Sequence, residues 1–338
     1  MSTEETMRAV VYNDYRGADG MRVVERPVPN PGAGEVRVRV HAAGLNAADW
    51  HLYLGDPWLA RASFGWRGPK TEGVIAKDLA GVVDAVGEGV SGFAVGDRVY
   101  GETWTGAASD FAVIKESELA PMPRGISFEE AAALPMGALT ASQGLRQAGM
   151  EDGTLPDAPR TLVVGASGGV GHLAAQIARV MGAGRVVAVC SSRNAQMLLD
   201  LGVDRVIAYD KESVFDCGET FDLVYDTVAT NPFRKIRAVM TKDGTYACAG
   251  GVGGGILLGP AWSVMSPKLV SPFFSQRGVS VAAAVSGEDL AKVTPWVEDG
   301  SVRPVIEKVY ELEDFAPALL RLESKHTAGK LVLRVAAS

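Results

Sequence analysis

The sequence contains few cysteines, and their spacing argues against two common kinds of site. Only three occur among the 338 residues, at Cys190, Cys217 and Cys248. They lie too far apart for a metal-binding knuckle, and an odd number makes a disulfide framework a poor explanation of the fold. We expect buried thiols in a reducing compartment, and therefore a cytoplasmic protein.

Long apolar runs and clusters of basic residues are also missing. No stretch approaches the roughly 20 uninterrupted apolar residues that a membrane helix needs. The acidic start of the chain does not resemble a signal peptide. Lysine and arginine total 33 against 40 acidic residues, which gives a net charge of −7. The lack of apolar runs leads us to expect no membrane span. Because phosphate affinity needs clustered basic residues, we also expect no nucleic-acid binding.

What is present is the composition of an ordinary globular enzyme, with 47% apolar and 22% charged residues. The length suggests about two domains of roughly 150 residues each. From Met7 to about Arg124, short segments are separated by glycine and proline turns, and residues 36–40 alternate valine with polar residues. This pattern favours a β-barrel or sandwich.

The pattern changes near Ser127, which forms a potential capping box with Glu130 at the start of an alanine-rich helix. From Thr161 onward, strand-like and helix-like segments alternate. The predicted strands are 161–165, 185–190, 205–208, 223–228 and 246–249, and the predicted helices are 172–181 and 195–201. This alternation predicts a doubly wound parallel sheet. A last strand is expected at 331–335.

A glycine-rich turn lies directly between the strand 161–165 and the helix 172–181. Its sequence is Ala166-Ser167-Gly168-Gly169-Val170-Gly171, the dinucleotide-binding fingerprint with Ala166 in place of the first glycine. Gly168 would let the backbone approach a pyrophosphate, and Gly171 would let the helix pack closely on the sheet. The start of the helix would favour the phosphate charge. The alternative is a purely structural turn.

The next strand bears on the choice between the two nicotinamide cofactors. An NAD-dependent enzyme usually ends this strand with Asp or Glu, whereas this chain has Cys190 followed by Ser191, Ser192 and Arg193. Two hydroxyls and a guanidinium suit a 2′-phosphate, so the sequence favours NADPH. Arg193 as a solvated loop residue is the alternative.

Several ordered motifs resemble those of the medium-chain dehydrogenase/reductase superfamily, and of its quinone oxidoreductase branch in particular. They are 42–50, 78–87, 95–99, 132–135, 139–141, the glycine turn and 326–333. The resemblance implies a GroES-like catalytic domain at 1–130, completed by 276–338, and a Rossmann NADPH-binding domain at 131–275. It also implies a homodimer joined through the edges of the Rossmann sheets.

Alcohol dehydrogenases of this superfamily hold a catalytic zinc, and the resemblance places their ligand positions at Leu45-Asn46 and Lys77-Asp78. No cysteine precedes Cys190, so neither the catalytic nor the structural zinc site is expected. Without a Lewis acid, oxidation of an alcohol is hard. Reduction of an electrophilic quinone or a conjugated enone depends less on a Lewis acid.

The resemblance also implies roles for residues near the nicotinamide. Asn46 would lie beside the ring and orient it or the substrate oxygen, and Asp49 would more simply hold the loop. His51 and Tyr53 are candidate proton donors, although His51 as a solvent-facing loop residue is equally compatible with the sequence. Thr140 would contact the nicotinamide end, or be an ordinary helix residue.

Further cofactor contacts are expected from the ends of later strands and from the returning chain. The resemblance points to Tyr209 and Lys325 at the adenosine phosphate. The candidates at the sheet and the carboxamide are Val228, Gly250, Gly251 and Val285. The stretch 55–77, with Trp58, Phe64 and Trp66, would either stack on a flat substrate or pack against its own domain.

The sequence therefore predicts NADPH-dependent, zinc-free reduction of a quinone or an α,β-unsaturated carbonyl compound. Two alternatives remain open. One is an enoyl-type reductase dedicated to a biosynthetic pathway, with a larger substrate in the same site. The other is a non-catalytic NADPH-binding protein.

Overall fold

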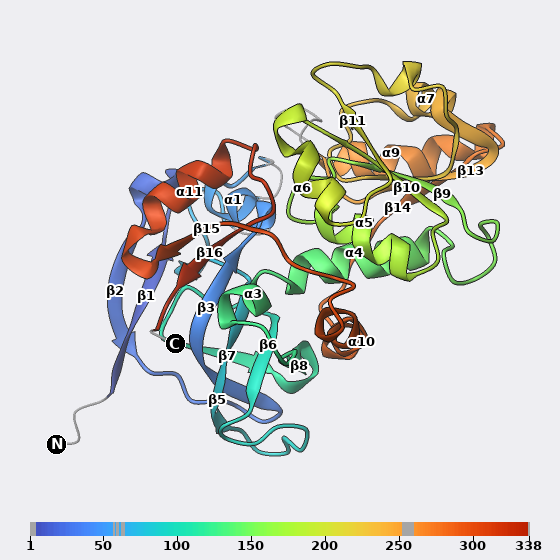
Figure 1. Cartoon of the computed structure of the whole chain (residues 1–338). Coiled ribbons are helices and arrows are strands. Elements are labelled where there is room, and N and C mark those ends of the chain that lie inside the picture. Colours follow the sequence, from blue (N-terminus) through green and yellow to red (C-terminus); the bar gives the residue numbers. More distant parts are fainter. Residues whose placement is uncertain (1–4, 57, 59–60, 62–64, 252–259, 337–338) are drawn as a thin grey trace. The chain divides into compact units, whose positions relative to one another are not determined.

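The computed structural model describes residues 5–56, 58, 61, 65–251 and 260–336 (Figure 1). The chain forms two compact units. The first unit comprises Met1–Met136, Val285–Glu298 and Pro304–Ser338, and the second comprises Gly137–Ala284 and Asp299–Arg303. Both ends of the chain therefore contribute to the first unit, as the resemblance implied for a GroES-like domain.

The first unit is built on two β-sheets. The smaller has the order β2-β1-β4, with β1 (Thr6–Tyr12), β2 (Arg22–Pro27) and β4 (Gly73–Val74). The larger has the order β15-β16-β3-β5-β6-β8, and β7 also pairs with β3. Its strands are β3 (Glu35–Leu45), β5 (Asp78–Val86), β6 (Arg98–Glu102), β7 (Phe111–Lys115), β8 (Leu119–Pro121), β15 (Ile306–Glu311) and β16 (Lys330–Arg334).

The alternation in residues 36–40 is the reason that β3 forms where it was predicted. Val36, Val38 and Val40 are fully buried, and Arg37 and Arg39 extend from the other face to ion pairs with Asp84. Burial of one face fixes the register of a strand, because a shift by one residue would turn all its valines toward water.

Helices flank these sheets. They are α1 (Ala47–Leu54), α3 (Phe128–Ala132), α10 (Gly287–Glu298) and α11 (Phe315–Glu323). The predicted capping box is confirmed: the Ser127 hydroxyl accepts from the Glu130 N–H at 3.2 Å, and the Glu130 carboxylate accepts from the Ser127 N–H at 2.8 Å. Tyr100 donates its hydroxyl to the Leu290 carbonyl at 2.9 Å, which ties α10 to the first unit.

The second unit contains the predicted doubly wound sheet. Six parallel strands lie in the order β11-β10-β9-β12-β13-β14. The strands are β9 (Arg160–Val164), β10 (Arg185–Cys190), β11 (Arg205–Ala208), β12 (Phe221–Asp226), β13 (Met240–Cys248) and β14 (Arg277–Ser280). The helices are α4 (Pro135–Gln147), α5 (Gly171–Val180), α6 (Ala195–Asp200), α7 (Phe233–Ile236) and α9 (Pro260–Val270).

Short 3-10 helices complete the secondary structure. They are η1 (Gly17–Gly20), η3 (Glu116–Glu118), η4 (Ser192–Asn194), η5 (Val214–Asp216), η6 (Arg237–Val239), η7 (Ser271–Phe273) and η8 (Leu312–Asp314).

The sheet continues past residue 275, where the sequence placed the end of the Rossmann domain. The segment from 266 onward holds the end of α9 and the edge strand β14. The strand is only four residues long, with the sequence Arg-Gly-Val-Ser, so it lacks an apolar run. A Cβ on Gly278 would lie 2.1 Å from the Pro267 carbonyl oxygen, which shows how closely α9 covers β14.

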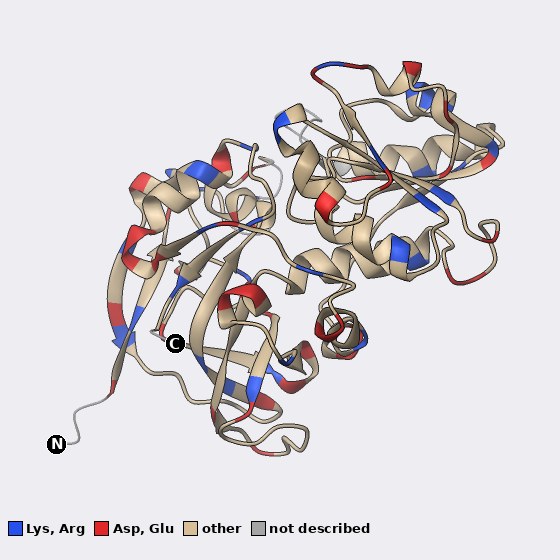
Figure 2. Cartoon of the chain, in the orientation of Figure 1, with Lys and Arg blue, Asp and Glu red and all other residues tan. Residues whose placement is uncertain are grey.

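Charged residues of both signs are interspersed over the described chain (Figure 2), in line with the expected absence of a basic stripe. Within the described ranges, no helix has the length and apolarity needed to cross a membrane.

Candidate active site

The glycine turn of the second unit has the geometry that its sequence predicted. Gly165 adopts φ +75°, a left-handed conformation that favours glycine, and the Ala166 N–H donates to the Val189 carbonyl at 3.0 Å. A Cβ on Gly171 would lie 2.2 Å from the Gly165 carbonyl oxygen, so only glycine lets α5 begin this close to β9. A Cβ on Gly168 would meet only one atom within 4 Å, at 3.4 Å. The turn therefore leaves its backbone open to a pyrophosphate, as NAD(P) binding requires.

Two side chains also form hydrogen bonds with the glycine turn. His172 is buried, and its Nδ1 lies 2.8 Å from the Gly168 carbonyl oxygen, which makes this nitrogen the protonated one. Asn194 donates its side-chain amide to the Ser167 hydroxyl at 3.0 Å. These bonds fix the turn before any nucleotide binds.

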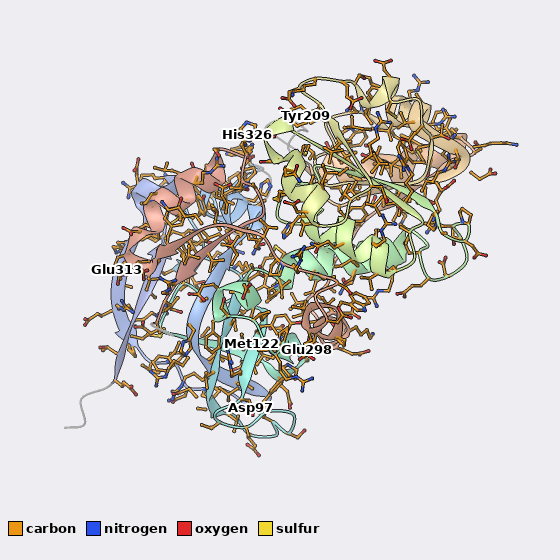
Figure 3. The ribbon with its side chains drawn as sticks, in the orientation of Figure 1. Asp97, Met122, Tyr209, Glu298, Glu313 and His326 are labelled. Carbon is orange, nitrogen blue, oxygen red and sulfur yellow. The ribbon has the colours of Figure 1, made fainter. Side chains whose placement is uncertain are left out.

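An acidic residue that was not among the predicted cofactor residues lies beside the end of β10. Asp210 accepts from the Ser192 N–H at 2.7 Å and from the Ser192 hydroxyl at 2.6 Å, and these bonds lower the pKa of Asp210. Asp210 lies two residues beyond β11, and the pairing of β11 with β10 brings it to this edge of the sheet. Arg193 is exposed, and Tyr209, labelled in Figure 3, is 59% exposed.

The carboxyl ends of β9, β12 and β13 align, because Asp226 is paired with both Val164 and Cys248. Val228 and Gly250 follow these ends, as predicted. The buried Asp226 organises this edge: it accepts from the Val228 and Ala229 N–H groups, each at 2.8 Å, and from the Tyr246 hydroxyl at 2.9 Å. Burial raises the pKa of Asp226, and the three donors offset part of that cost.

The remaining predicted cofactor residues lie in both units and make different contacts. The Thr140 carbonyl, on α4, accepts from the Tyr225 hydroxyl at 2.7 Å. Gly251 follows Gly250 beyond β13. Val285 belongs to the first unit and is half-buried. Lys325, also in the first unit, has φ +58° and places its ammonium 4.5 Å from the centroid of the Trp50 ring.

In the first unit, Asn46 lies between β3 and α1 and is buried. Its side-chain Nδ2 donates to the Asp78 Oδ2 at 3.0 Å, and its Oδ1 accepts from the Lys330 ammonium. Lys330 also forms an ion pair with Asp78 at 2.8 Å, with the two side chains only 2% and 0% exposed. Because both ends of the amide are bonded, the Asn46 side chain is held in one orientation.

Asp49 caps the same helix. Its Oδ2 accepts from the Asn46 N–H at 2.8 Å, and this geometry favours the loop-holding role that the sequence suggested for it. Its Oδ1 is buried and has no hydrogen-bond partner among the residues that the structure describes. Burial raises the pKa of Asp49 to about 7, against the opposing effect of Lys77.

Two more charged groups complete this region. The Lys77 ammonium donates to the Trp104 carbonyl at 2.9 Å, and Glu102 lies directly opposite Asp78 on the neighbouring strand. Burial and the Asp78 charge raise the pKa of Glu102 to about 8. We call Asp49, Lys77, Asp78, Glu102 and Lys330 the buried charge cluster.

Four members of the buried charge cluster were absent from the predicted site. Lys77 and Asp78 lie at the positions where the resemblance places zinc ligands, and neither was predicted to take part in the reaction. Glu102 and Lys330 lie within strands, and no local pattern indicates that their side chains turn inward.

The two candidate proton donors beside Asn46 lie in unsuitable surroundings. His51 is half-buried and stacks on Trp50, and its Nδ1 lies 2.7 Å from the Asp56 carbonyl oxygen, so Nδ1 carries the proton. Burial lowers the pKa of His51, and the neutral ring then offers only an acceptor at Nε2. Tyr53 is 1% exposed, within the apolar core of the first unit, and burial raises its pKa.

The aromatic stretch predicted at 55–77 is partly described. Trp58 and Trp66 are both exposed and meet edge to face, with ring centroids 5.1 Å apart. Arg61 and Tyr15 anchor the stretch to the first unit, since Tyr15 donates to the Gly65 carbonyl at 2.7 Å. Phe64 lies outside the described residues.

Comparisons with known proteins agree with this architecture. Residues 32–134 match the family model of the alcohol dehydrogenase GroES-like domain, and residues 201–333 match that of a zinc-binding dehydrogenase. A 2-methylene-furan-3-one reductase from Solanum lycopersicum is 31% identical over 98% of this chain and 80% of its own length. The chloroplastic quinone-oxidoreductase QR1 from Triphysaria versicolor is 30% identical over 97% of this chain and 98% of its own.

Solved structures share the fold along the whole chain. The quinone oxidoreductase from Coxiella burnetii superposes with a TM-score of 0.83 at 23% identity, covering 98% of this chain and 100% of its own. A structure described as an NAD-dependent alcohol dehydrogenase has a TM-score of 0.80 at 30% identity, covering 97% of this chain and 100% of its own.

The fold, the glycine turn and these matches define a pyridine-nucleotide-dependent oxidoreductase of the medium-chain dehydrogenase/reductase superfamily. Within that superfamily the chain belongs to the quinone oxidoreductase branch. The described part of the chain contains no group of three or more His, Cys, Asp or Glu side chains arranged to hold a metal ion.

The raised pKa of Asp49 predicts a stability effect. The unfolded chain releases this proton near pH 4, whereas the folded chain keeps it up to about pH 7. Asp49 therefore lowers stability progressively as the pH rises between these values. Asp49→Asn removes the titration but keeps an oxygen for the Asn46 N–H. Its free energy of unfolding, relative to wild type, should rise by about 2 kcal/mol between pH 5 and pH 8.

Urea unfolding at the two pH values measures this difference, and Asp243→Asn, at an exposed position, is the control. A pH dependence identical in wild type and Asp49→Asn would show that Asp49 is ionised in the folded protein at pH 5.

Proposed function

We propose that the protein reduces quinones or α,β-unsaturated carbonyl compounds with NADPH, and that it does so without zinc. The observation that carries this proposal is the buried charge cluster, in which the Lys330 ammonium bonds to Asn46 and the Lys77 ammonium acts on Asp49 and Glu102. The names of the two relatives, a furanone reductase and a quinone oxidoreductase, support the same class of acceptor. When bound, the nucleotide would supply hydride, and the residues of this chain would hold it at the glycine turn.

The charges of the cluster support zinc independence. Zinc in proteins is bound by thiolate, imidazole or carboxylate ligands. Here Asp78 is already paired with Lys330, and Lys77 approaches both Asp49 and Glu102 closely enough to shift their pKa values. A divalent cation would have to displace these ammonium groups, which instead supply the positive charge for a substrate oxygen.

Activity and metal content test this proposal directly. Purified protein should consume NADPH in the presence of a panel of small quinones and enones, and treatment with a chelator should not change the rate. Elemental analysis should find no stoichiometric zinc. The proposal fails if NADPH is consumed no faster than in the absence of enzyme, or if activity depends on bound zinc.

The preference for NADPH is proposed from the end of β10. No carboxylate ends this strand, and Arg193 is exposed beside Ser191 and Ser192. Asp210 works against this preference, because its negative charge holds Ser192 and would repel a 2′-phosphate. We propose that the attraction between Arg193 and the 2′-phosphate is stronger than the repulsion from Asp210.

Two substitutions separate these contributions. Arg193→Ala should weaken NADPH binding by roughly 1.5–3 kcal/mol, the usual strength of a charge-assisted hydrogen bond, and leave NADH binding unchanged. Asp210→Asn should tighten NADPH binding alone. Fluorescence titration with each nucleotide gives the affinities, and equal effects on both nucleotides would remove Arg193 from the 2′-phosphate site.

We also propose a cytoplasmic homodimer. Support for assembly comes from β14, the edge strand of the six-stranded sheet, and from exposed apolar residues on the adjoining α9 and η7. These are Trp262, Met265, Leu269 and Phe273. A dimer formed along this edge would cover them, and a monomeric mass in solution would contradict it.

A further inference from the structure

The Lys77 side chain is 4% exposed, yet its ammonium makes one hydrogen bond in the described part of the chain, to the Trp104 carbonyl. An ammonium has three donors, so two remain for another acceptor. Lys330, by comparison, donates to both Asn46 and Asp78. Burying a cation with unused hydrogen-bond donors is costly. A ligand oxygen that accepts from the remaining Lys77 donors would offset this cost.

The backbone that presents Lys77 is strained and rigid. Ala76, the residue before it, has φ +64°, a conformation that costs energy for any residue with a Cβ. The Ala76 carbonyl accepts from the Ala107 N–H at 2.9 Å, and the Lys77 carbonyl accepts from the Thr103 N–H at 2.8 Å. These bonds hold the turn in place, and strain of this kind is typical of functional positions.

The carboxyl groups near Lys77 can hold a proton and pass it on. The buried charge cluster has three carboxyl groups and two ammonium groups, so it carries one excess negative charge unless one carboxyl is protonated. Burial raises the pKa values of Asp49 to about 7 and of Glu102 to about 8, and lowers that of Lys77. The unpartnered Asp49 Oδ1 and Glu102 can therefore hold a proton near neutral pH.

The indole of Trp104 lies beside the ammonium. It is 58% exposed, and Lys77 Nζ lies 5.3 Å from the centroid of its ring. A flat, conjugated acceptor that stacks on the exposed part of this indole would bring its carbonyl oxygen toward Nζ. The buried ammonium thus lies beside an exposed indole on which a planar carbonyl compound would stack.

We propose that Lys77 is the proton donor to the carbonyl oxygen of the acceptor, and that Asp49 or Glu102 returns a proton to it. This proposal rests on the proposed function. As hydride adds to the β-carbon of an enone, the C=C electron pair shifts toward the carbonyl carbon and the C=O pair moves onto oxygen. The Lys77 N–H bond then breaks, nitrogen keeps the electron pair, and the new O–H bond gives an enol.

The remaining steps restore the enzyme. The neutral Lys77 amine takes a proton from the protonated carboxyl, and the resulting carboxylate takes up one proton from bulk solvent, so that each hydride transferred consumes one solvent proton. The enol becomes the ketone in solution. A quinone that accepts hydride and one proton yields the hydroquinone by the same transfer.

The test compares two acceptors that differ in their need for a proton. A simple enone forms a basic oxyanion when it gains hydride, whereas an electron-poor halogenated quinone forms a stable anion. Lys77→Met, which keeps the length of the side chain, should lower kcat for the enone about 10²- to 10⁴-fold, the usual contribution of general acid catalysis. The loss for the halogenated quinone should be much smaller, and NADPH affinity should be unchanged.

Matched variants separate proton transfer from structure. Lys308→Met removes an exposed lysine that lies over the Tyr310 ring in the same unit, and it should leave both rates unchanged. Lys77→Arg keeps the charge but cannot release a proton near neutral pH, so it should remain slow with the enone. Wild type should reduce the enone more slowly in deuterated water, which tests the transfer even if Lys77→Met does not fold.

The outcomes distinguish the two proposals. If wild type reduces neither acceptor, the proposed function fails. If wild type is active but folded Lys77→Met loses both activities equally, or neither, Lys77 is not the proton donor. A wild-type rate with the enone that is identical in deuterated water also overturns the role of Lys77.

Discussion

The ion pair between Lys330 and Asp78 is the contact on which the first unit depends. It joins β16, from the end of the chain, to β5, from its first third, and both side chains are almost completely buried. Asn46 bonds to both partners, and Asp78 also accepts from the Met136 N–H at 3.0 Å. Within the first unit, one pair of opposite charges therefore fixes the start of α1 and the backbone at Met136.

This arrangement explains why so many charged groups tolerate burial in one place. Removing charges from water is costly, and the cost is offset only when each charge finds partners with good geometry. Asp78 and Lys330 satisfy that condition, whereas Asp49, Glu102 and Lys77 do so only in part. Their shifted pKa values follow from this difference. The well-paired members hold the cluster together, and the others are the members whose pKa values are shifted.

The sequence predicted most of the fold because local patterns determine it. The parallel strands β10 and β11 have the predicted bounds, and the glycine turn and the capping box at Ser127 have the predicted geometry. The buried charge cluster could not be predicted in this way. Its members come from distant segments, and nothing local shows that Lys330 turns toward Asp78. Asp210 was missed for the same reason, since only strand pairing brings it to Ser192.

A double-mutant cycle on Lys330 and Asp78 tests the central claim most directly. Lys330→Met and Asp78→Asn each remove one charge and leave the other buried without its partner, which should lower the free energy of unfolding by about 3–5 kcal/mol. The double variant should cost clearly less than the sum of the two. If the single losses are small, or if they simply add, the pair does not organise the first unit.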